Sequence, residues 1–146
     1  MRVEDVNTVD PKPVVGVYSF GSKVSTGRPQ AQYEFDITTM RDPSGQKQFV
    51  KESDGRSELV RKWIGEDDRV PGIISFCRML ADDLVKPKTR TTENATRVEP
   101  VSQWLSIAFY DFHGKWAAPA IAEIVADALS DDGYTVAVKH YALKQG

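Results

Sequence analysis

Residues 104–143 read WLSIAFYDFHGKWAAPAIAEIVADALSDDGYTVAVKHYAL, and this stretch decides the fold class. Residues 104–112 are the most hydrophobic strand expected in the chain, and residues 134–143 form the last strand. Between them, apolar residues recur from Trp116 to Leu129 at the spacing of an amphipathic helix, which Gly133 closes. A strand, a glycine-containing turn, a helix and a strand make a βαβ unit. This unit predicts parallel pairing, a right-handed crossover and function at the carboxyl ends of the strands.

Further strands and helices are expected upstream of this unit. Residues 14–20, VVGVYSF, are rich in branched and aromatic residues, as in a buried strand, and residues 31–38 alternate apolar with polar side chains. Ser57 is the expected N-cap of a short helix over residues 57–65. Helical spacing of apolar residues predicts a longer helix from about residue 68 to residue 85.

The segments between these elements set the domain boundaries. Residues 1–13 carry prolines and charges without apolar periodicity, which predicts a flexible tail. Residues 86–100 have almost no apolar side chain and predict a flexible, locally positive loop. Its basic residues are Lys86, Lys88, Arg90 and Arg97. We therefore expect a single α/β domain over residues 14–146, with a mainly parallel sheet of about four strands and flanking helices.

Composition excludes several classes of function. The chain has 146 residues, 40% of them hydrophobic and 27% charged, which is typical of a globular protein rather than a disordered one. No apolar run approaches the roughly 20 residues of a membrane span, and no signal sequence is evident, so we expect a cytoplasmic protein without a membrane partner. One cysteine, Cys77, and two histidines without ligand spacing predict neither a disulfide nor a metal or other cofactor.

The turn from Asp111 to Lys115 is the most informative local feature. It joins a buried strand to a helix whose free N–H groups and positive dipole end can receive an anion. A parallel sheet places the end of the first strand beside this turn, so that Lys23 and Lys115 could share one anion. The candidate ligand-binding residues are Ser19, Gly21, Lys23, Asp111, His113, Gly114, Lys115 and Trp116.

Plainer interpretations of the same residues stay open. Gly114 would merely allow a tight turn, His113 would cap the helix, the lysines would be solvated, and Trp116 would belong to the core rather than stack on a base or sugar ring. The pattern GxxxxGK[ST] of nucleotide triphosphatases and the GxSxG motif of serine hydrolases are both absent, so we expect no enzyme. An acid–base pair of Asp36 and Asp111, aided by His113, is the catalytic alternative.

The net charge of −2 argues against a general nucleic-acid binder. RNA binding would need a local basic patch, and the candidate residues for it are Lys86, Lys88, Arg90 and Arg97.

Three segments resemble the C-terminal domain of the RapZ group of RNase adapter proteins. The family opens with a strand ending in SFG, a lysine shortly after, a YGxP-like turn and a strand written roughly DADLVFDVRFLPNP. Residues 19–23 (SFGSK), 26–29 (TGRP) and 31–43 (AQYEFDITTMRDP) follow that order, with Thr38 in place of the arginine after DV. The family's closing strand, GYxVxVxHRDL, matches residues 133–143 except at Tyr141 and Ala142.

The family's strand and turn IAIGCTGGxHRSVALAE aligns without a gap with residues 107–123. Gly114 is kept and Lys115 takes the variable position, but the polar residues change. The replacements are Asp111 and Phe112 for the Cys-Thr pair, His113 for the first glycine, and Trp116, Ala117 and Ala118 for the His-Arg-Ser trio.

This resemblance covers about residues 15–143. Family members carry an N-terminal P-loop kinase-like domain as well. The resemblance here covers only the C-terminal domain, so we expect a stand-alone C-terminal-like domain. The family's C-terminal domain is implicated in binding small regulatory RNA, an amino-sugar phosphate and protein partners, and in oligomerisation. Arginine can bind phosphate through two parallel hydrogen bonds, whereas the methyl side chain of Ala117 cannot. Lys23 and Lys115 would therefore substitute for it as point charges.

We therefore expect a non-catalytic, regulatory binding module that recognises a phosphorylated small molecule of the amino-sugar phosphate class, or RNA phosphate. The alternative is a protein-interaction or regulatory module whose ligand pocket has decayed, of phage or other mobile-element origin. The resemblance also implies a homo-oligomer as one assembly state.

Overall fold

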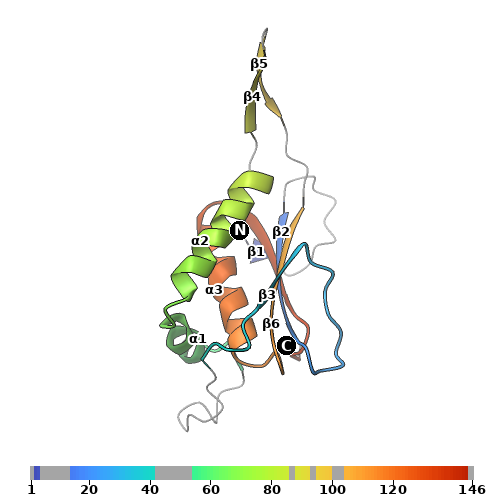
Figure 1. The fold of residues 1–146 in the computed structure, drawn as a ribbon, viewed down its shortest axis with the longest axis vertical. Coiled ribbons are helices and arrows are strands. Elements are labelled where there is room, and N and C mark those ends of the chain that lie inside the picture. Colours follow the sequence, from blue (N-terminus) through green and yellow to red (C-terminus); the bar gives the residue numbers. More distant parts are fainter. Residues whose placement is uncertain are drawn as a thin grey trace.

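A parallel sheet lies at the centre of the fold in the computed structural model (Figure 1). Its strands are β1 (Arg2–Val3), β2 (Val14–Gly21), β3 (Tyr33–Asp36), β6 (Leu105–Asp111) and β7 (Thr135–His140), in the order β1-β7-β2-β6-β3. All neighbours in this sheet pair in parallel. The structure describes residues 2–3, 14–41, 54–85, 88–92, 95–99 and 104–144. The expected α/β fold with a mainly parallel sheet is confirmed.

Strand β2 lies between the two strands of the βαβ unit. Ser19 is in register with Phe109 of β6 on one side and with His140 of β7 on the other. The predicted parallel pairing is present, but β6 and β7 each pair with β2 and not with each other. The physical reason is the apolar character of β2, which is buried along most of its length and so takes the central position.

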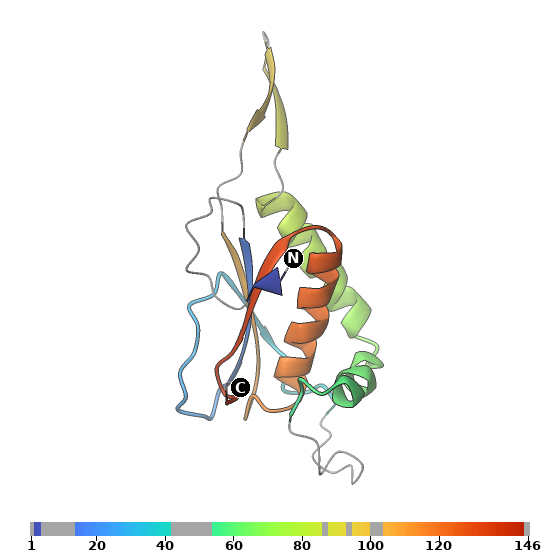
Figure 2. The same cartoon turned by 180° about the vertical axis from the view of Figure 1, so that it is seen from behind.

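All the helices of the described residues lie on the same face of the sheet (Figures 1 and 2). Helix α3 (Ala117–Asp131) packs on β2, β6 and β7, and helices α1 (Glu58–Gly65) and α2 (Val70–Leu84) pack against α3. Alanines on α3 bring this helix close to the sheet, where Val17, Ile107 and Phe109 are fully buried. No helix in the described ranges is both long enough and apolar enough to cross a membrane.

The helix ends follow the sequence signals. Ser57 is the N-cap of α1, and Pro71 lies in the first turn of α2. Pro119 lies in the first turn of α3, where the missing N–H costs no intrahelical bond. Helix α3 ends before Gly133, which adopts a φ of 97°, in the left-handed region that glycine tolerates.

Residues 88–99 were expected in a flexible loop, and this expectation was wrong. Strands β4 (Lys88–Thr92) and β5 (Ala95–Glu99) pair antiparallel and extend away from the sheet and helices (Figure 1). The missed signal is the density of β-branched residues, because threonine and valine favour strands even where few side chains are apolar. These are Thr89, Thr91, Thr92, Thr96 and Val98.

Two other segments differ from expectation in extent. The second strand is limited to β3, shorter than the predicted 31–38. Within the tail predicted for residues 1–13, Arg2 and Val3 pair with Val136 and Ala137 as an edge strand. Residues 4–13 lie outside the described residues.

Phe109 of β6 belongs to a chain of aromatic rings that links the sheet to helix α2. Its ring stacks on Phe35 at 5.2 Å between centroids, and Phe35 meets Phe76 of α2 edge-on at 5.7 Å. Phe109→Ala should lower the free energy of unfolding by about 3–5 kcal/mol, because it leaves a cavity at a fully buried position. Urea unfolding measures this, with Leu59→Ala at a half-exposed position as the control, expected to change stability by about 0.5 kcal/mol or less. Equal effects of the two substitutions would contradict the packing described.

Candidate functional site

Two turns meet at the carboxyl edge of strands β2 and β6. The backbone N–H of Ser22 donates to the carbonyl of Asp111 at 2.8 Å, and that of Lys23 donates to the carbonyl of Phe112 at 2.9 Å. The expectation that the parallel sheet brings these turns together is confirmed.

Gly21 and Gly114 allow the two turns to touch. A Cβ at Gly21 would lie 2.5 Å from the carbonyl carbon of His113, and one at Gly114 would lie 2.7 Å from the backbone nitrogen of Gly21. Gly114 also has a φ of 67°, which other residues rarely adopt. The role of these glycines in the structure is therefore close backbone approach.

The carboxylate of Asp111 occupies the backbone donors of the second turn. One oxygen accepts from the N–H of Gly114, and the other accepts from the N–H of Ala118 at 3.1 Å. Trp116, the N-cap residue of α3, makes no side-chain cap bond, so Asp111 supplies the cap in its place. The donors expected to receive a ligand's anion are thus paired with the chain's own carboxylate.

A pocket of about 130 Å³ opens beside this turn, between the end of β3 and the start of α3. It contains four of the predicted ligand residues, Asp111, His113, Lys115 and Trp116. The other lining residues are Ile37, Thr38, Met40, Arg41, Phe112 and Ala117. The lining therefore combines the cations Arg41 and Lys115 with one carboxylate. Ser19, Gly21, Lys23 and Gly114 do not line it.

Both predicted lysines rest on aromatic rings. Lys115 Nζ lies 4.9 Å from the centroid of Trp116, and Lys23 Nζ lies 4.0 Å from that of Phe112. Trp116 is half-buried, packs against the core and also lines the pocket. Lys115 belongs to the pocket, whereas Lys23 sits outside the lining, on the ring of Phe112.

The loop before α2 holds the segment after β3 that carries Arg41. The guanidinium of Arg69 donates to the hydroxyl of Thr39 at 2.8 Å and to its carbonyl at 2.9 Å, and it pairs with Asp67 at 3.0 Å. Hydrogen bonds from Arg69, side chain first, lower the pKa of Asp67 to about 2, and the backbone of Arg41 contributes another. Sequence reasoning missed Arg41, because its place depends on α1 and the 67–69 loop.

Asp36 and Asp111 do not form the acid–base pair considered above. Asp36 is in register with Tyr110, the neighbour of Asp111, so the two carboxylates lie on opposite faces of the sheet. A carboxylate oxygen of Asp36 accepts the N–H of Thr38 at 2.9 Å, which caps the strand end.

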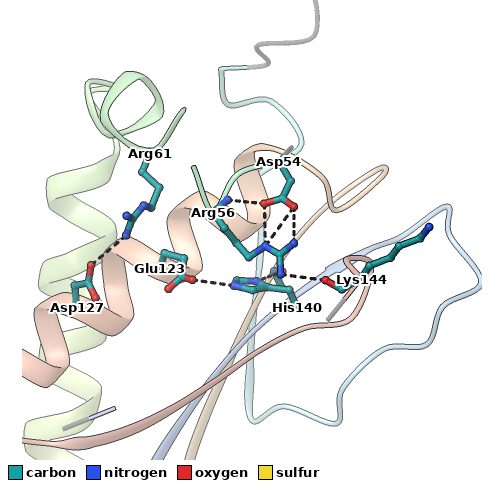
Figure 3. Close-up of polar contacts among 8 residues, drawn as sticks. Asp54, Arg56, Arg61, Glu123, Asp127, His140 and Lys144 are labelled. Atoms are coloured by element: carbon teal, nitrogen blue, oxygen red, sulfur yellow. Dashed lines mark hydrogen bonds and ion pairs between the residues drawn. The ribbon is translucent and has the colours of Figure 1, made fainter. Parts of the chain in front are cut away.

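A second polar group lies inside the helix-covered face (Figure 3). His140 Nδ1 lies 2.7 Å from the hydroxyl of Ser19, and its Nε2 lies 3.3 Å from a carboxylate oxygen of Glu123 on α3. Ser19 is fully buried and the histidine side chain is 8% exposed, so this chain of contacts joins β2, β7 and α3 away from solvent. Ser19 therefore has a partner within the fold. The missed signal was the parallel register, which sets Ser19 opposite His140.

The segment of Asp54, Gly55 and Arg56 adjoins this group. Arg56 pairs with Asp54 at 2.7 Å and donates to the carbonyl of Lys144 at 3.1 Å (Figure 3). The N–H of Gly55 donates to the carbonyl of Lys115 at 2.7 Å. Burial alone would raise the pKa of Asp54, but hydrogen bonds from Arg56 outweigh it and hold that pKa below its usual value. This segment thus fastens the pocket turn to the segment after β7.

The predicted RNA-binding residues are not part of the pocket. Lys86 lies outside the described residues. Lys88 and Arg90 belong to β4, and Arg97 belongs to β5, in register with Arg90. In the described part of the chain, no group of three or more His, Cys, Asp or Glu side chains could hold a metal ion.

These features define a small α/β binding domain with its pocket at the carboxyl edge of a parallel sheet. A family model described as the RapZ C-terminal domain matches residues 13–144. The chain therefore belongs to the RapZ C-terminal domain family, which indicates a regulatory or binding module. A search of the curated proteins found no match to this chain.

Asp111→Ala should lower the free energy of unfolding by about 1–2 kcal/mol, because Gly114 and Ala118 lose their acceptor at the start of α3. Asp131→Ala, at the exposed last turn of the same helix, is the control and should leave stability unchanged or slightly higher. Thermal and urea unfolding measure both. A loss no greater for Asp111→Ala than for Asp131→Ala would show that the carboxylate is not the cap.

The Asp67–Arg69 contact should make stability depend on acid pH. Since the pKa of Asp67 is lowered from 3.8 to about 2, its contribution is complete above about pH 4 and is lost as the pH falls through 2. Asp67→Asn should therefore be less stable than the parent at neutral pH, and the difference should vanish near pH 2. Urea midpoints measured across that range test this. A difference that persists unchanged into acid would contradict it.

Proposed function

We propose that this protein is a non-catalytic binding module that takes a phosphorylated small molecule of the amino-sugar phosphate class into the pocket beside α3. One observation carries the proposal: the pocket of about 130 Å³ brings the cations Arg41 and Lys115 together with the carboxylate of Asp111. A ligand with a phosphate at one end and an ammonium or hydroxyl groups at the other complements that charge distribution.

The surrounding contacts are consistent with each end of such a ligand. The oxygens of Asp111 each accept one backbone N–H, and a carboxylate oxygen has a second lone pair for a donor on a sugar. Trp116 and Phe112 add aromatic surface to the lining, of the kind that packs on the apolar face of a sugar ring. Lys115 is exposed and its ammonium is held near Trp116, so it is accessible to a phosphate.

A protein-interaction role is the second candidate. It is favoured by large apolar side chains that stay exposed, including Phe76 and Met79 on α2 at 42% and 54%. RNA phosphate is the alternative anion for the basic residues of the β4–β5 hairpin.

The direct test is isothermal titration of the protein with a hexosamine phosphate, the unphosphorylated hexosamine and a short RNA at low salt. We expect saturable binding of the phosphorylated sugar, and binding about tenfold weaker in Lys115→Ala, which removes a charge-assisted contact. Lys62→Ala, an exposed lysine of α1 outside the pocket, is the matched control and should bind like the parent.

Other outcomes separate the candidates. Binding of RNA alone would favour the hairpin, and no binding of any probe would favour the protein-interaction role. Equal loss in Lys115→Ala and Lys62→Ala would place the ligand elsewhere.

A further inference from the structure

Arg41 differs from every other arginine whose side chain the structure describes. The others each pair with a carboxylate within 3.5 Å. These are Arg28, Arg56, Arg61, Arg69 and Arg78. Among the described residues, no carboxylate pairs with the guanidinium of Arg41, which lines the pocket. With respect to the described residues, this guanidinium therefore has its charge-assisted hydrogen bonds still to make.

The side chain of Arg41 is nevertheless held in place. Its guanidinium carbon lies 5.0 Å from the ring centroid of Trp63, and one terminal nitrogen donates to the carbonyl of Trp63 at 3.3 Å. The turn beneath it is anchored by Arg69 through Thr39. Trp63 engages one terminal nitrogen. Within the part of the chain that the structure describes, no hydrogen-bond partner contacts the edge formed by Nε and the other terminal nitrogen. A guanidinium fixed in this way loses little entropy when it binds.

The two cations that line the pocket differ in what they can bind. Arg41 follows β3 and Lys115 precedes α3, whose first residue, Ala117, lines the same pocket without a charge. A lysine ammonium is a point charge, whereas a guanidinium can form a planar two-bond contact.

Resting on the proposed function, we propose that Arg41 is the specificity-determining residue of the pocket. It binds the phosphate of the ligand through two parallel N–H bonds, and Lys115 contributes the second charge. The Nε edge of the guanidinium matches two oxygens of one phosphate, so the pocket should prefer a phosphate over a neutral hydroxyl group.

The first test uses inorganic phosphate as the probe and the ¹H–¹⁵N resonances of the arginine Nε groups as the readout. We expect a saturable shift of the Arg41 resonance, with those of Arg28 and Arg78 unchanged. A saturable shift of the ¹H–¹⁵N resonance of Lys115, without a shift of the Arg41 Nε resonance, would overturn the role of Arg41 and leave the proposed function standing. No saturable shift anywhere would also overturn it, and titration with the hexosamine phosphate would then decide the proposed function separately.

The second test compares Arg41→Ala and Arg41→Lys with Arg78→Ala, which removes an arginine paired with Asp132 and outside the pocket. Affinity for the hexosamine phosphate should fall by about tenfold or more in Arg41→Ala. Arg41→Lys should recover part of that loss, because it restores charge but not the planar fork. Affinity for the unphosphorylated sugar should not change.

Thermal unfolding shows whether each variant is folded. If Arg41→Ala does not fold, the affinity of Arg41→Lys for the hexosamine phosphate and the Arg41 Nε resonance of the parent protein still test the role of Arg41. Parent-like affinity in a folded Arg41→Ala would refute the assignment, and so would full recovery in Arg41→Lys, since charge alone would then suffice.

Discussion

The close approach of two backbone turns is the constraint on which the rest of the site depends. Gly21 ends the central strand and Gly114 follows its neighbour, and neither position has room for a side chain. The contact fixes the turn between the end of β6 and the start of α3. This turn places Asp111 within hydrogen-bond distance of the first amides of the helix. Pocket, cap and helix position therefore follow from one backbone contact.

The distribution of charge explains how the pocket stays cationic in a chain of net charge −2. Asp111 faces the helix start, and in the described part of the chain five arginines outside the pocket pair with carboxylates. The described residues include five cation–aromatic contacts. Arg41, Lys23 and Lys115 are among the cations in these contacts, and each of them lies against an aromatic ring.

Sequence patterns predicted most of the architecture because periodicity reports burial. The continuous apolar run of β2 and the helical spacing in α3 reflect the burial of these elements in the core. The β4–β5 hairpin extends away from the sheet and helices, and its strand signal lies in β-branching alone. The order of strands was also beyond local patterns, since β2 enters the sheet between two strands more than 80 residues later in the chain.

For the site, sequence reasoning placed the turn and Lys115 correctly beside the strand ends, because parallel strands share an edge. It assigned the amide of Gly114 to a ligand, whereas Asp111 takes it, since a carboxylate so near a helix start reaches the free donors first. Arg41 and the Ser19–His140–Glu123 contacts could not be found this way. Each joins residues whose separation in the chain carries no pattern. The packing of α1 brings Trp63 to Arg41, the register of β2 and β7 brings Ser19 to His140, and the packing of α3 adds Glu123.

The Asp54–Arg56 segment ties distant parts of the chain to one point. Gly55 is bonded to the carbonyl of Lys115 while Arg56 is bonded to that of Lys144, so three backbone segments share a single junction. The same junction therefore sets the position of the pocket turn relative to the segment after β7, although the two are separated by a whole helix and strand in the chain.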